Sequence, residues 1–167
     1  MNPASGALLP AGLCTHGASL DVASSAEDAF SLLCAVEKWP VWLSFLRSAR
    51  RPEGDEWPSL GSEVILRSTL PGDEEELYEV DGYIANYRLS LVGAYSVRRR
   101  IDFRIEQRSA CSKLHVLITY PAYHGRIGSM LDRWRHGRRV AVALDESLVH
   151  FKGLVEYKRD AEVLADF

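Results

Sequence analysis

The strongest constraint on the fold is a stretch of about 30 residues near the C-terminus that contains no proline and is patterned like a helix. It extends from Arg126 to about Tyr157. At 1.5 Å per residue, a helix of this length runs for about 45 Å, which is enough to cross a whole β-sheet. Its apolar series consists of Ile127, Met130, Leu131, Trp134, Ala141, Leu144, Leu148, Phe151 and Val155.

The middle of the chain alternates apolar and polar residues with a period of two, which indicates strands that are wet on one face. Tight turns separate these segments, for example 71–73, where proline fixes one backbone angle and glycine permits another. Neighbouring strands joined by short turns pair in an antiparallel meander. The expected strands are 64–70, 77–85, 89–92, 96–106 and 113–120.

A strand and two short helices are expected before this meander. Residues 18–23 alternate weakly, and Ser24 or Ser25 is a suitable N-cap for a helix that ends before Pro40. The apolar run 41–46 predicts a second short helix with Pro40 near its start.

This order of elements resembles the helix-grip fold of the START/polyketide cyclase-dehydrase superfamily, also called SRPBCC, which includes birch-pollen-allergen-like proteins. The resemblance covers residues 18–157. It implies an α+β fold, with a curved antiparallel sheet wrapped around a long C-terminal helix and two short helices after the first strand. It also implies a ligand-binding domain, expected at 15–160. The segments on either side are expected to be a leader at 1–14 and a tail at 161–167. The matching segments are VASSAEDAF (22–30), EKWPVWL (37–43), YEVDGY (78–83) with Arg88-Leu89, and ESLVHFKGL (146–154).

A curved sheet around one helix leaves a cavity, because a helix about 10 Å wide fills only part of the concave face. An apolar cavity with a few polar groups suits an aromatic or aliphatic ligand. The alternative for each aromatic residue is plain core packing. The predicted lining is Trp42, Phe45, Leu66, Ser68, Tyr78, Val80, Leu91, Arg99, Ile101, Phe103, Ile118, Tyr120 and Trp134.

Arg99 and Gly137 are unusual residues on faces expected to point inward. Arg99 shares the register of Ile101 and Phe103, and a buried guanidinium needs a carboxylate partner or an anionic ligand group. The alternative is that Arg99 reaches solvent at the strand end. Gly137 costs about 1 kcal/mol relative to alanine inside a helix. Close approach of a ligand or a strand would explain it, and so would a mild helix irregularity.

Charge distribution bears on the partners. The balance of 20 Lys and Arg against 23 Asp and Glu gives a net charge of −3, which argues against nucleic-acid binding. Arg133, Arg135 and Arg139 belong to the densest basic cluster, which suits contact with an anionic membrane or with a polar ligand at the cavity mouth. The alternative is a solvated face paired with carboxylates. The acidic run 73–76 is expected to be a solvated loop.

The remaining patterns argue against several classes of site. The histidines have no metal-ligand spacing, and neither a metal nor a cofactor is expected. The three cysteines are widely spaced, which suits free thiols in a reducing cytoplasm. No segment approaches the roughly 18 consecutive apolar residues that span a bilayer.

Three functions are compatible with this sequence. The first is binding or carriage of a hydrophobic small molecule, such as a lipid, a quinone or a polyketide-like compound. The second, which the resemblance permits, is a cyclase or dehydratase in which Tyr120, Tyr78 or Arg99 moves a proton or polarises a carbonyl. The third is a protein-interaction module in which no ligand binds.

Overall fold

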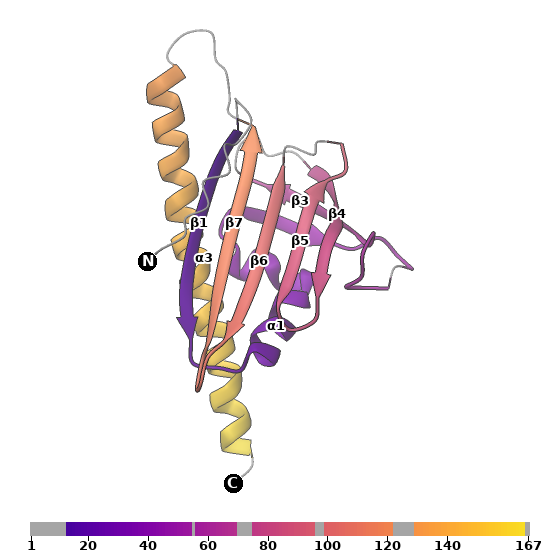
Figure 1. Ribbon diagram of the computed structural model, residues 1–167, viewed down its shortest axis with the longest axis vertical. Helices are drawn as coiled ribbons and strands as arrows, with labels where there is room; N and C mark the ends of the chain where they lie inside the picture. Colours follow the sequence, from indigo (N-terminus) through magenta and orange to yellow (C-terminus); the bar gives the residue numbers. More distant parts are fainter. Residues whose placement is uncertain (1–12, 55, 70–74, 96–98, 122–128, 166–167) are drawn as a thin grey trace.

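In this computed structural model, the residues that the structure describes include seven strands, which form one curled antiparallel sheet (Figure 1). The structure describes residues 13–54, 56–69, 75–95, 99–121 and the backbone of 129–165, with side chains from 136 to 158 in the last segment. The spatial order of the strands is β1-β7-β6-β5-β4-β3-β2. Their bounds are β1 Leu13–Val22, β2 Leu46–Arg50, β3 Glu63–Ser68, β4 Glu75–Ile84, β5 Arg88–Gly93, β6 Arg100–Gln107 and β7 Ser112–Pro121.

The long helix α3 (Ser129–Ala165) packs along β1 and runs nearly the full length of the molecule (Figure 1). Between β1 and β2 come α1 (Ala26–Cys34), a single 3-10 turn η1 (Val36–Lys38) and α2 (Trp39–Trp42). The side chain of Ser25 caps α1 by accepting a hydrogen bond from the backbone N–H of Asp28 at 3.1 Å. The α+β helix-grip architecture expected from the sequence is confirmed.

One expected element is wrong. The run 41–46 was expected to continue as a helix, but α2 ends at Trp42 and the edge strand β2 begins at Leu46. The backbone N–H of Ser44 donates to the Ser147 hydroxyl of α3 at 2.9 Å, and β2 pairs with β3. These long-range hydrogen bonds outweigh the local helical pattern.

Two boundaries also differ from expectation. The first strand begins at Leu13, inside the segment expected as a leader, because all of β1 pairs with β7 from Leu13↔Pro121 to Val22↔Ser112. The last helix continues to Ala165, past Tyr157, through a segment of mostly good helix formers.

Aromatic rings fill one part of the space between the sheet and α3. Trp42 packs edge-on against Phe151 of α3, with ring centroids 4.8 Å apart, and against Phe103 of β6 at 6.0 Å. The ring centroids of Trp39 and Phe103 are 5.7 Å apart. All four rings are fully buried, and their packing holds α3 against the sheet.

Replacing Phe151 by alanine should reduce the free energy of unfolding by about 3–5 kcal/mol, because it removes a buried ring and leaves a void. The matched control is Val149→Ala on the same helix, where the side chain is 62% exposed. This control should change stability by no more than about 0.5 kcal/mol. Urea unfolding measures both changes, and equal effects would contradict the packing of α3 described above.

The two glycines of α3 make a second matched pair. A Cβ on Gly137 would lie 3.1 Å from Cε1 of His16, whereas a Cβ on Gly153 would have no atom within 4 Å. Gly153→Ala should therefore stabilise the protein by about 1 kcal/mol through helix propensity. Gly137→Ala should gain nothing or lose stability, because the imidazole must move. Equal gains in urea unfolding would argue against the close approach of β1 to α3.

Candidate functional site

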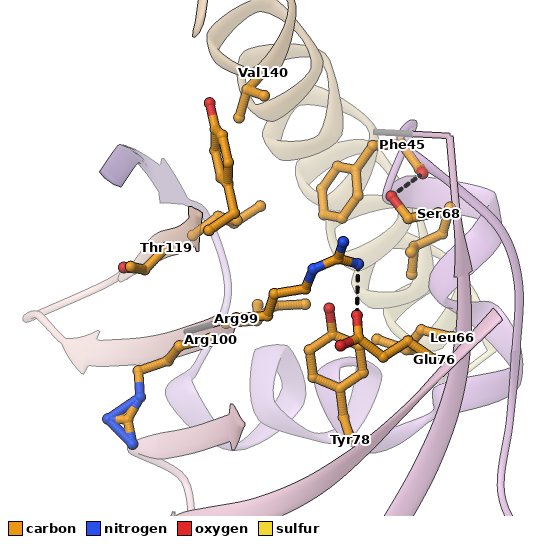
Figure 2. A pocket seen from close by; sticks show the side chains of 13 residues that line it. Phe45, Leu66, Ser68, Glu76, Tyr78, Arg99, Arg100, Thr119 and Val140 are labelled. Atoms are coloured by element: carbon orange, nitrogen blue, oxygen red, sulfur yellow. Dashed lines mark hydrogen bonds and ion pairs between the residues drawn. The ribbon is translucent and has the colours of Figure 1, made fainter. Parts of the chain in front are cut away.

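A cavity of about 50 Å³ lies between the inner face of the sheet and α3 (Figure 2). This volume exceeds the space of one water molecule but is several times smaller than the roughly 300–1,000 Å³ of pockets for drug-sized ligands. Its walls come from the segment before β2, from β3, β4, β6 and β7, and from α3. The lining residues are Phe45, Leu46, Leu66, Ser68, Glu76, Tyr78, Arg99, Arg100, Ile101, Ile118, Thr119, Tyr120 and Val140.

The structure brings many of the expected lining residues to this cavity. They are Phe45, Leu66, Ser68, Tyr78, Arg99, Ile101, Ile118 and Tyr120. Each lies on the inward face of its strand or at the entry to β2.

Four other expected residues do not line the cavity: Trp42, Val80, Leu91 and Phe103 lie in the hydrophobic core. They face inward as expected, but rings such as Trp39 and Phe151 fill the concave face beside them. The side chain of Trp134 lies outside the described residues.

An ion pair lies in one part of the cavity wall. Nη1 of Arg99 donates to Oε2 of Glu76 at 2.7 Å, and the two side chains are 21% and 14% exposed (Figure 2). The hydroxyl of Tyr78 lies beside this pair and interacts with both side chains. Arg99 is therefore paired, which is the expectation for a largely buried guanidinium.

Glu76 was missed by the sequence analysis, which assigned 73–76 to a solvated loop. The structure places Glu76 in β4 with its side chain directed into the cavity beside Tyr78. The signal was present in the sequence, because Glu76 continues the period-two series of Tyr78 and Val80 toward the N-terminus. The acidic character of the run concealed this register.

The two tyrosines of the cavity are protonated at neutral pH. Burial raises the pKa of the Tyr78 hydroxyl well above its usual range, and the nearby Glu76 carboxylate raises it further. Burial likewise raises the pKa of Tyr120 to about 12. Both hydroxyls are therefore hydrogen-bonding groups rather than bases.

The remainder of the lining is mainly apolar. Phe45, Leu66, Ile101 and Val140 are each at most 5% exposed and offer only carbon atoms to the cavity. The hydroxyl of Ser68 is already committed, because it donates to the carbonyl of Phe45 at 3.2 Å. The cavity is therefore largely apolar, with the Arg99–Glu76 pair and Tyr78 in one part of its wall, and Arg100, Thr119 and Tyr120 add further polar groups elsewhere.

Other expected features lie apart from the cavity. Arg139 is exposed, whereas the side chains of Arg133 and Arg135 lie outside the described residues. Cys14, Cys34 and Cys111 are unpaired thiols. Within the described part of the chain, no helix is both long enough and apolar enough to cross a membrane.

Comparison with solved structures finds proteins similar to this chain, whereas comparison with family models and curated sequences finds none. A START superfamily protein from Mycobacterium smegmatis has a TM-score of 0.65 at 17% identity, covering 86% of this chain and 97% of that one.

Two further solved structures are similar. The Zhui aromatase/cyclase from a Streptomyces species has a TM-score of 0.67 at 12% identity, covering 86% of this chain and 94% of that one. A protein from Thermus thermophilus has a TM-score of 0.71 at 13% identity, covering 87% and 99% of the two chains. At these identities the likeness shows the fold alone. The chain thus has the helix-grip fold of START and polyketide cyclase-like proteins, which the order of its strands and the position of α3 had indicated.

Proposed function

We propose that this protein binds a small, mainly apolar molecule that carries one uncharged oxygen group, and that it holds this molecule between the sheet and α3. The observation that carries the proposal is the Arg99–Glu76 pair, with Tyr78 beside it, in the wall of a largely apolar cavity. A buried ion pair contributes little stability compared with apolar residues of similar volume. Its place in a cavity wall therefore favours a role in recognition.

The pairing of Arg99 with Glu76 favours an uncharged ligand. The two charges offset each other, so a carboxylate ligand would be attracted by Arg99 and repelled by Glu76 at similar distances. A hydroxyl or carbonyl oxygen can accept a hydrogen bond from one of the remaining N–H groups of Arg99, which leaves the pair intact, and a hydroxyl can donate to the Tyr78 oxygen. A hydroxyl group can also donate to Glu76.

Ligand entry requires the walls to move, because a molecule with two fused rings needs more than the 50 Å³ of the cavity. We infer that the walls that move are Phe45, at the junction before β2, and Val140, on α3, because neither residue belongs to the central strands of the sheet. Lipids, quinones and polyketide-like compounds fit this description of a ring or chain with an oxygen at one end.

A cyclase or dehydratase is the second candidate. The fold similarity to the Zhui aromatase/cyclase permits it. The raised pKa values of Tyr78 and Tyr120 argue against proton transfer by these side chains at neutral pH, because an efficient acid or base has a pKa near the working pH. An interaction module without a ligand comes third, because it gives the buried Arg99–Glu76 pair no role.

We also propose a cytoplasmic location and peripheral contact with anionic membranes. The three free thiols suit a reducing compartment. Arg139 is exposed on α3, in the same helical stretch as Arg133 and Arg135, and could meet lipid phosphates.

Three naphthalene compounds of nearly equal size test the preference for an uncharged group: 2-naphthol, 2-naphthoate and 2-naphthylmethylammonium. Isothermal titration calorimetry at pH 7.5 should show that the protein binds 2-naphthol at least about tenfold more tightly than either ion. Glu76→Gln should raise the affinity for 2-naphthoate by about tenfold, because Arg99 loses its counter-ion. Tyr78→Phe should weaken 2-naphthol binding about five- to tenfold through loss of one hydrogen bond.

The matched control is Glu79→Gln, which removes the same charge from an exposed position three residues along β4. It should leave all three affinities within about twofold. Failure of all three compounds to bind the unmodified protein would refute the cavity as an apolar binding site. Tightest binding of 2-naphthoate to the unmodified protein would refute the preference for an uncharged group.

A further inference from the structure

Two histidines on different elements enclose one tyrosine of the cavity wall. His16 of β1 stacks on Tyr120 of β7, with ring centroids 5.8 Å apart and an interplanar angle of 11°. His136 of α3 meets the same ring edge-on, at 5.5 Å and 81°. Tyr120 also lines the cavity, so the two imidazoles connect α3 to the cavity wall through a single side chain.

The contact between β1 and α3 at this point is close. Gly137 follows His136, and a Cβ there would lie 3.1 Å from Cε1 and 3.3 Å from Nε2 of His16. The absence of a side chain at Gly137 thus allows His16 to pack directly against the helix. The Nε2 atom of His136 is buried and has no hydrogen-bond partner within the described residues.

This environment disfavours positive charge on either imidazole. Burial lowers the pKa of both histidines, and for His136 the nearby Arg139 and His16 lower it further. Among the described residues, the titratable groups that act on this cluster are Cys14 of β1, Tyr120 of β7 and Arg139 of α3. None of these three is a carboxylate that could offset a new positive charge.

We propose that His16 and His136 form a pH-sensitive latch that holds the N-terminal half of α3 on β1 and releases it when the imidazoles are protonated. Release would separate Val140 of α3 from Tyr120 of β7, two walls of the cavity. Acidification would therefore open the cavity and speed ligand exchange. This last consequence rests on the proposed function, whereas the movement of the helix does not.

The direction of the pH effect on helix release follows from proton linkage. In the open state both imidazoles are hydrated, and their pKa is about 6.5. In the closed state the pKa values are lower, so protons bind the open state preferentially. The helix is held fully above about pH 6.5 and is released progressively as the pH falls below that value toward the lowered pKa values.

The test measures proton binding and helix movement separately on the full chain between pH 8 and pH 5. The NMR shifts of the imidazole Cε1–H groups should give pKa values below 6.5 for His16 and His136, with His150 as an exposed reference on the same helix. Amide hydrogen exchange, corrected for the intrinsic effect of pH, should show residues 137–147 losing protection on acidification. For each histidine, the protection should fall by a factor that approaches ten for every pKa unit by which its NMR value lies below 6.5. The factors for the two histidines multiply. Residues 148–158 should keep their protection.

Matched variants identify the groups responsible. His16→Gln and His136→Gln should each reduce the pH response, and the double variant should abolish it, whereas His150→Gln should leave it unchanged. Asp132 stands four residues before His136, and its side chain lies outside the described residues. The response should persist in Asp132→Asn.

Several results would overturn the latch. They are pKa values of His16 and His136 at or above 6.5, unchanged protection of residues 137–147 at pH 5, a response that survives in the double variant, or one that disappears in Asp132→Asn. A separate arm follows the dissociation rate of 2-naphthol by stopped-flow fluorescence. If 2-naphthol does not bind at any pH, the proposed function fails, while hydrogen exchange still decides whether the latch exists.

Discussion

A single helix cannot fill the concave face of a curled sheet, and the rest of this structure follows from how the chain meets that constraint. Trp39, Trp42, Phe103 and Phe151 close one part of the space with packed rings. The other part stays hollow, and there β4 and the start of β6 bring Glu76 and Arg99 together. The packed rings thus stabilise the fold, and the cavity is where we propose that a ligand binds.

The cavity and the contact between α3 and β1 have residues in common. Glu76, Arg99 and Tyr78 form a polar part of the cavity wall, and in our proposal their paired charges select a ligand group that is polar but uncharged. Tyr120 and Val140 form walls that depend on how closely α3 rests on β1. That closeness depends in turn on Gly137, which admits the imidazole of His16. In our proposal, ligand binding and the docking of α3 are therefore coupled through a few side chains.

Much of the fold was predictable because apolar periodicity is strong in α3 and in β6 and β7. The strand β2 was missed because its sequence LRSAR carries no apolar alternation, and its pairing with β3 is a long-range interaction. For the site, the period-two register identified which residues face inward but not how deep they lie. Phe103 and Ile101 share a face and a strand, yet only Ile101 reaches the cavity. Glu76 was hidden by its acidic neighbours, and the packing of His16 against Gly137 brings together distant parts of the chain.

The most direct test of the central claim is a crystal structure of the protein with 2-naphthol. The naphthalene rings should lie between the sheet and α3, in contact with Phe45, Ile118 and Val140. The naphthol oxygen should be within hydrogen-bonding distance of Tyr78 or Arg99 while the Arg99–Glu76 pair stays intact. A complex in which the compound occupies an outer surface and the cavity keeps its unliganded volume would contradict the account.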